Sequence, residues 1–176
     1  MAGWTPKAKA FWPLLAVLVL ADCSTKRLAV ERLSPPYVPH EIVGDWLRFT
    51  LAYNSGAAMG ISFGGYSRIG LALVAVGALA VLGTLYHRSS AGDYRRGAAL
   101  ALVTGGAAGN LLDRLGSTRG VVDFIDLGVG DLRFWTFNMA DIGITCGAVI
   151  LAILLARAER RAAAEAIFSK SPTEAP

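Results

Sequence analysis

The chain has 176 residues, a length typical of one domain, and 54% of them are hydrophobic whereas only 17% are charged. This composition is too apolar for an ordinary soluble domain and indicates a membrane protein. The formal net charge of +4 is spread along the borders of apolar stretches, so it indicates the flanks of membrane helices and argues against a nucleic-acid surface.

Four apolar stretches predict four transmembrane helices, at residues 11–30, 69–86, 97–112 and 142–156. The second stretch carries no charge over 18 residues, which is enough to span a bilayer. The 16 uncharged residues between Arg96 and Asp113 span only about 24 Å, less than the hydrocarbon thickness of about 30 Å. We therefore expect Asp113 and Arg114 at membrane depth. The fourth stretch is also too short to span the hydrocarbon core, so we expect Asp141 at membrane depth as well. The small residues of GGAAG (105–109) suit close helix packing.

The first stretch contains charges of its own. Only 11 uncharged residues precede Asp22, so Asp22 and Lys26 are expected inside the span. They stand four residues apart on one helical face with the acid first, the order that favours an ion pair. Cys23 and Cys146 also lie in apolar stretches, where we expect buried free thiols rather than a disulfide.

Basic residues predict the orientation of the helices. Four spans place both termini and the short loop after the second stretch on one side of the membrane. Nine of the 17 Lys and Arg residues lie on that side: Lys7, Lys9, Arg88, Arg95, Arg96, Arg157, Arg160, Arg161 and Lys170. By the positive-inside rule this side is cytoplasmic, and the polar ends of the helices then lie near the outer face.

The outer loops are expected to contain β-structure. Residues 45–54 (DWLRFTLAYN) and 130–137 (GDLRFWTF) have the β-branched and aromatic bias of strands. Trp46 and Trp135 suit a membrane interface. We expect one domain over residues 1–165 and a disordered cytoplasmic tail over 166–176.

Two acids with apolar neighbours are the candidate catalytic residues: Asp123 in VVDFIDL (121–127) and Asp141 in FNMADIGI (137–144). A carboxylate near lipid costs several kcal/mol, which indicates a function. Two carboxylates that converge can share a proton, as in hydrolytic acid pairs. Asp126 lies in the same segment with equally apolar neighbours, so the sequence pattern alone does not decide which of Asp123 and Asp126 is the catalytic acid. A small proton-coupled transporter or channel is the alternative, but its polar residues should be spread through the bilayer, whereas these gather at one end.

Five blocks carry a family resemblance: ADCSTK (21–26), NSGAAMG (54–60), GGAAGNLLDR (105–114), VVDFIDL and FNMADIGI. In this order they resemble the bacterial lipoprotein signal peptidases, also called signal peptidase II, over nearly the whole chain. Two positions depart from the family pattern. Cys23 stands where a glutamine is frequent, and Met59 where a phenylalanine is common.

The resemblance implies an intramembrane aspartic endopeptidase that removes the signal peptide from diacylglyceryl-modified prolipoproteins, cleaving before the lipidated cysteine. It implies a mainly α membrane protein of the inner membrane, with four transmembrane helices, a small extracytoplasmic β-cradle at about residues 40–62 and a short periplasmic helix. Asp123 and Asp141 would form the catalytic dyad near the periplasmic face and activate a water. The substrate-binding or dyad-supporting positions would be Asn54, Asn110, Arg114, Asn138, Asp22 and Lys26.

Some roles stay open at this point. Arg114 either pairs with Asp113 or contacts substrate, and Asp22 and Lys26 form either a structural pair or a substrate contact. No metal, cofactor or nucleic acid is expected. The expected partners are prolipoproteins, membrane lipid and the cyclic peptide inhibitor globomycin, and the expected state is a monomer.

Overall fold

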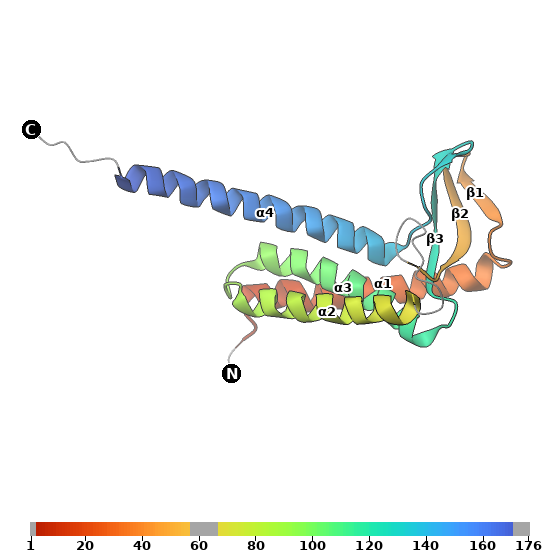
Figure 1. The fold of residues 1–176 in the computed structure, drawn as a ribbon, viewed down its shortest axis with the longest axis horizontal. Coiled ribbons are helices and arrows are strands. Elements are labelled where there is room, and N and C mark those ends of the chain that lie inside the picture. Colours follow the sequence, from red (N-terminus) through yellow and green to blue (C-terminus); the bar gives the residue numbers. More distant parts are fainter. Residues whose placement is uncertain (1–2, 57–66, 171–176) are drawn as a thin grey trace, which may run out of the picture.

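The computed structural model describes residues 3–56 and 67–170. The elements in chain order are α1 (Pro6–Arg32), β1 (Pro39–Val43), β2 (Leu47–Asn54), α2 (Ser67–Arg88), α3 (Tyr94–Gly116), β3 (Val121–Val129), β4 (Leu132–Arg133) and α4 (Met139–Lys170). The helices run side by side, and the sheet stands across one end of them, opposite both termini (Figure 1). The protein is thus mainly helical with one small antiparallel sheet.

All four predicted apolar stretches lie inside helices, and each helix extends beyond the stretch that predicted it. α4 continues through Lys170, so the expected tail begins as helix. Residues 57–62 of the expected cradle, with Met59, and residues 171–176 of the tail lie outside the described residues. In the described connection between α3 and α4 the chain forms β3 and β4, and a separate short helix does not occur there.

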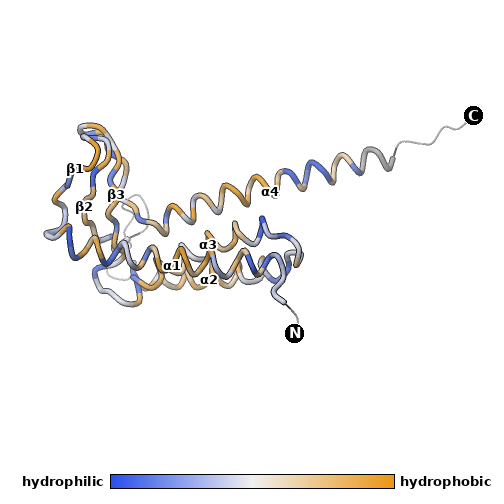
Figure 2. Tube along the Cα trace, turned by 180° about the vertical axis from the view of Figure 1, so that it is seen from behind, coloured by the Kyte–Doolittle hydropathy of each residue, from blue (hydrophilic) through white to orange (hydrophobic). Residues whose placement is uncertain are grey.

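Three helices of the described residues are long and apolar enough to cross a membrane: α1, α2 and Met139–Glu165 of α4. Figure 2 shows their apolar lengths, with hydrophilic residues at the ends of the bundle and on the turns of α4 that follow its apolar length. The predicted free thiols Cys23 and Cys146 are exposed, so the expectation that they are buried is wrong. Apolar residues of a membrane helix face lipid, and an apolar neighbourhood in the sequence therefore does not imply burial.

α3 is the central helix, because it contacts α1, α2 and α4. Its small residues allow this close approach, as the GGAAG block predicts. A Cβ atom at Gly106 would collide with Ala140 O of α4, and one at Gly109 would collide with Asp22 of α1. α3 is the one long helix of the described residues that is not apolar enough by composition to count as a membrane span, and its contacts with three other helices cover part of its surface with protein.

The sheet has the order β1-β2-β3-β4 with antiparallel pairing throughout. Ala52 pairs with Asp123 and Asn54 with Val121, so the end of β2 lies beside the start of β3. The strand predicted at 45–54 is confirmed as β2, whereas only Leu132–Arg133 of the segment 130–137 forms a strand. Figure 1 shows how this sheet brings β3 next to the first turn of α4.

Candidate active site

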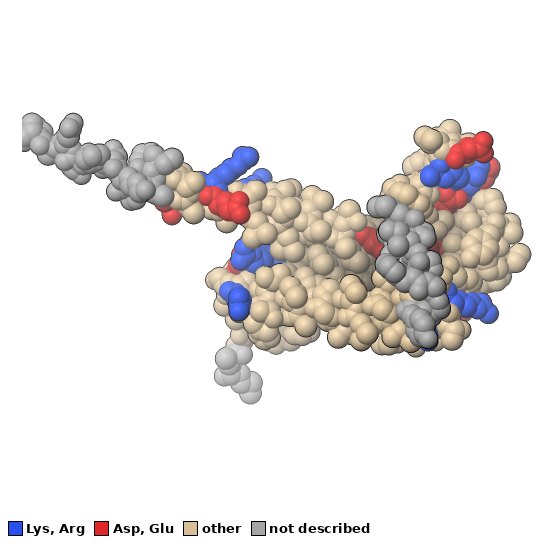
Figure 3. All heavy atoms as spheres, in the orientation of Figure 1, with Lys and Arg blue, Asp and Glu red and all other residues tan. Residues whose placement is uncertain are grey.

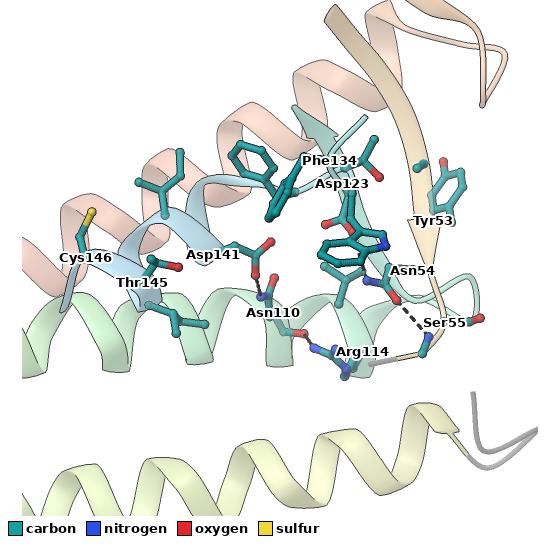
Figure 4. A pocket seen from close by; sticks show the side chains of 18 residues that line it. Tyr53, Asn54, Ser55, Asn110, Arg114, Asp123, Phe134, Asp141, Thr145 and Cys146 are labelled. Atoms are coloured by element: carbon teal, nitrogen blue, oxygen red, sulfur yellow. Dashed lines mark hydrogen bonds between the residues drawn. The ribbon is translucent and has the colours of Figure 1, made fainter. Parts of the chain in front are cut away.

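A cavity of about 800 Å³ lies where α3, α4 and the sheet meet. Five predicted site residues line it: Asn54, Asn110, Arg114, Asp123 and Asp141. Its apolar lining includes Phe134, Trp135, Phe137, Ile142 and Ile144. In Figure 4 the carboxylates of Asp123 and Asp141 point toward each other in this space. The two acids that the sequence separates by 17 residues therefore belong to one site.

Asp123 lies on β3 with only 3% of its surface exposed. Its Oδ1 accepts a hydrogen bond of 2.7 Å from Asn138 Nδ2, and its Oδ2 accepts one of 3.2 Å from Asn54 Nδ2. Burial, followed by the negative charge of Asp141, raises the pKa of Asp123 to about 7, although the two amide donors and Lys26 act in the opposite direction. Asp123 can therefore carry a proton at neutral pH.

Asp141 lies in the first turn of α4 and forms a capping box with Asn138. Asn138 Oδ1 accepts a hydrogen bond of 3.1 Å from Asp141 N, and Asp141 Oδ2 accepts one of 3.1 Å from Asn138 N. The other oxygen, Oδ1, accepts a bond of 2.8 Å from Asn110 Nδ2. These bonds hold the Asp141 carboxylate at a helix N-terminus, where the backbone dipoles favour negative charge.

Asn138 is the residue that joins the two acids. It is fully buried behind the cavity, caps α4 through its oxygen and donates to Asp123 through its nitrogen. The same amide group donates to Asn110 Oδ1 at 3.2 Å and to Val122 O at 3.3 Å. One neutral residue thereby contacts both carboxylates without adding a charge: its side-chain amide donates to Asp123, and its backbone N–H donates to Asp141.

Arg114 lines the cavity and donates to Asn110 O at 3.0 Å. Asp113 pairs with Lys26 rather than with Arg114, so the first of the two roles considered for Arg114 is wrong. Its guanidinium lies near Asp123 and Asp141. A group of three His, Cys, Asp or Glu side chains suited to a metal ion does not occur within residues 3–56 and 67–170.

Asp22 and Lys26 lie behind the cavity rather than in its lining. Lys26 Nζ is 2.7 Å from Asp22 Oδ2, which confirms the pair expected four residues apart in the sequence. The same ammonium group binds Asp113, a residue for which the sequence suggested only a partner in Arg114. Asp113 stands three residues after Asn110 on one face of α3, and this spacing is the signal that could have linked it to the site.

Asp126, the rival of Asp123, has structural partners outside the cavity. Its Oδ1 accepts a hydrogen bond of 2.7 Å from Arg133 Nε, and its Oδ2 accepts one of 3.0 Å from Thr50 Oγ1. Residues three apart on a strand face opposite sides, so only one of the two acids can face the cavity. The geometry favours Asp123.

Residues 14–157 match the family described as signal peptidase (SPase) II. The chain belongs to this family. The lipoprotein signal peptidase of Photorhabdus laumondii is 38% identical over 149 residues, which cover 81% of this chain and 84% of that protein. The lipoprotein signal peptidase of Klebsiella aerogenes is 39% identical over 146 residues, with 81% and 85% covered.

Two solved structures of bacterial membrane enzymes share the fold. One has a TM-score of 0.74 at 25% identity and covers 93% of this chain and 92% of that chain. The other has a TM-score of 0.70 at 28% identity, with 81% and 89% covered. Together with the family match, these similarities identify the chain as a peptidase of a bacterial membrane, and the transporter alternative is wrong.

Proposed function

We propose that this peptidase removes the signal peptide from diacylglyceryl-modified prolipoproteins by cleaving before the lipidated cysteine. Asp123 and Asp141 form its catalytic dyad. The observation that carries the proposal is the convergence of these two carboxylates in one cavity, with Asn138 hydrogen-bonded to both. The substrate class comes from the family, whose curated relatives are lipoprotein signal peptidases.

In the proposed reaction Asp123 is the acid and Asp141 the base. Asp141 takes a proton from a water, and the resulting hydroxide attacks the scissile carbonyl carbon while Asp123 gives its proton to the carbonyl oxygen. The C–N bond then breaks as Asp141 passes its proton to the leaving nitrogen, and the diol returns a proton to Asp123. The pKa of about 7 at Asp123 supports this division, since burial and, after it, the charge of Asp141 favour the protonated form of this acid.

The surroundings of the dyad suit a lipidated substrate. Phe134, Trp135 and Ile142 supply apolar lining beside the acids, next to helix surfaces that face lipid. The diacylglyceryl group is held in the outer leaflet, and an active site at the sheet end of the helices could receive it there. The sheet then serves as the extracytoplasmic cradle, and Asn54 and Arg114 are available to bind the peptide backbone.

The proposed topology has four spans, with α3 as the fourth. Its 23 residues reach about 35 Å, enough for the hydrocarbon core. Both termini lie at the end opposite the sheet, and on the face drawn in Figure 3 charged side chains gather at the two ends of the molecule. We infer an inner-membrane monomer with cytoplasmic termini, an active site near the periplasmic face and sensitivity to globomycin.

The decisive test is cleavage of a diacylglyceryl-modified prolipoprotein by purified Asp123→Asn and Asp141→Asn variants. Each substitution should lower kcat by about 10²–10⁴-fold, the usual contribution of an acid or base. Mass spectrometry of the product should place the new N-terminus at the lipidated cysteine. Unlipidated prolipoprotein serves as the substrate control and should be cleaved poorly.

Asp126→Asn is the matched control, because it changes a nearby acid of the same strand that faces away from the cavity. It should keep substantial activity. Near-parental cleavage by either dyad variant would overturn the assignment. If Asp126→Asn alone abolished turnover, Asp126 would have to replace Asp123 in the dyad.

A further inference from the structure

We propose that Asp22, Lys26 and Asp113 form a positioning triad that sets the spacing of the two catalytic aspartates. This inference rests on the function proposed above. The triad lies behind the cavity, on α1 and α3. It contacts the backbone of the residue that precedes each catalytic acid, and it reaches the reaction only through those contacts.

Lys26 is the centre of the triad and is almost completely buried. Its Nζ lies 2.7 Å from Asp22 Oδ2, 2.9 Å from Asp113 Oδ2 and 2.9 Å from Asn110 Oδ1. An ammonium group has three donors, and here each has an acceptor at hydrogen-bonding distance. The third contact continues the network toward the dyad, since Asn110 Nδ2 donates to Asp141.

Asp22 holds the start of α4. Its Oδ1 accepts a hydrogen bond of 2.9 Å from Ala140 N, one of the amide groups that a helix N-terminus leaves without a backbone partner. Ala140 directly precedes Asp141. Gly109 of α3 makes room for this contact, because a Cβ atom there would collide with Asp22 Oδ2.

Asp113 holds the start of β3 in the same way. Its Oδ2 accepts a hydrogen bond of 3.1 Å from Val122 N, and Val122 directly precedes Asp123. The two carboxylates of the triad thus bind two equivalent backbone groups, one before each catalytic acid. Lys26 connects them across a few ångströms, whereas the chain between Asp123 and Asp141 runs through 17 residues and a hairpin.

The triad also accounts for two of the three charges in the first apolar stretch, Asp22 and Lys26, whereas the third, Arg27, pairs with Glu31. Asp22 and Lys26 do not line the cavity, and their contacts lie on α3, α4 and each other. Lys7 offers a comparison: it is equally buried, but it donates to Tyr86 O and Ser89 O at the far end of the bundle. Among the described residues, Lys7 neither lines the cavity nor binds a member of the triad, so Lys7→Met is the matched control.

The test measures kcat and KM of full-length Asp113→Ala and Asp113→Asn on the diacylglyceryl-modified prolipoprotein, together with thermal unfolding. A misplacement of about 1 Å costs about 10²-fold in rate, so we expect Asp113→Ala to lose about 10²-fold in kcat with little change in KM. Asp113→Asn keeps an oxygen for Val122 N and should recover most of that rate. Lys7→Met should lower the unfolding temperature and leave kcat near the parental value.

Gly109→Ala tests the contact between Asp22 and the backbone N–H of Ala140 without removing a charge. Its Cβ atom would displace Asp22 from its place between Lys26 and Ala140, and kcat should again fall while KM holds. Gly77→Ala is the matched control, since a Cβ atom at Gly77 meets open space. If Asp113→Ala does not fold, two other measurements test the triad: the kcat of Gly109→Ala and amide hydrogen exchange of the parental protein. The proposal requires that the backbone amides of Val122 and Ala140 are protected from exchange.

A parental kcat in Asp113→Ala or Gly109→Ala, a loss confined to KM, or rapid exchange of both amides in the folded parent would each overturn the triad. The dyad variants separate this failure from failure of the proposed function. If Asp123→Asn and Asp141→Asn are inactive while Asp113→Ala is fully active, only the triad is wrong. If the dyad variants stay active, the proposed chemistry itself fails.

Discussion

Substitution of Asn138 by serine separates the two functions of one buried side chain. A serine at this position can still cap α4 by accepting the hydrogen bond from Asp141 N. It cannot reproduce the 2.7 Å bond from Asn138 Nδ2 to Asp123 Oδ1. Asn138→Ala removes both interactions, so the difference between the two variants isolates the helix cap.

The structure gives the expected losses of stability. A buried hydrogen bond to a charged group contributes about 1.5–3 kcal/mol. A helix cap contributes about 1 kcal/mol. The free energy of unfolding should therefore fall by about 2 kcal/mol in Asn138→Ser and by about 3 kcal/mol in Asn138→Ala, measured by equilibrium unfolding in mixed micelles at about pH 9, where Asp123 is ionised.

The same substitutions change the pH dependence of catalysis. The amide of Asn138 favours the charged form of Asp123, so its removal raises the pKa of Asp123 above its parental value of about 7. The proposed acid must be protonated, and activity is then lost as the pH rises through this pKa. The alkaline limb of the pH–activity profile should move upward by about one pH unit, because the lost hydrogen bond contributes about 1.5 kcal/mol and this corresponds to about one pKa unit.

Turnover of the diacylglyceryl-modified prolipoprotein between about pH 5 and pH 9 tests this expectation. An alkaline limb that moves downward or stays in place in Asn138→Ser would refute the assignment of Asp123 as the acid under the control of Asn138. Equal stability of the serine and alanine variants would show that the cap contributes nothing.

Three further predictions concern stability. The pKa of Asp123 is raised from 3.8 to about 7, so its contribution to stability is fully present below pH 3.8 and lost as the pH rises through 7. Asp123→Asn has no charge to bury and should be inactive yet melt at a higher temperature than the parent at about pH 8; an unchanged melting temperature would contradict this. Gly120 has a φ of +99° and lies against Asn54 O, so Gly120→Ala should lower stability by more than about 1 kcal/mol, whereas Gly116→Ala, in open space, should not. Arg133→Ala leaves Asp126 without its ion-pair partner and should lower the free energy of unfolding by about 3 kcal/mol; thermal unfolding of Arg133→Ala and Arg133→Ala/Asp126→Asn checks this, and the double variant should recover part of the loss.

The helices were predictable because lipid imposes a simple requirement on sequence. Long apolar stretches predict α1, α2 and α4, and the length of the third stretch correctly brings Asp113 and Arg114 near the same end as Asp141. The pair of Asp22 and Lys26 follows from helical spacing alone. These features depend on local composition and on a fixed rise per residue.

The meeting of Asp123 and Asp141 could not be derived from spacing. It depends on the register of β3 against β2 and on the approach of β3 to the first turn of α4. The choice between Asp123 and Asp126 was open by pattern because β3 was not recognised as a strand, although Val121, Val122, Phe124 and Ile125 are strong strand formers. The contacts of Asp113 required the packing of α1 against α3, which no local pattern encodes.

The central place of α3 has a consequence for how the protein enters the membrane. α2 and α3 are joined by only five residues, so we expect them to insert together as one hairpin. Asp113 lies in the last turn of α3 and gains its counter-ion only when α1 supplies Lys26. Asp141 meets Asn110 only when α4 docks. In the proposed mechanism, hydrolytic competence therefore arises only after α4 has docked against α3.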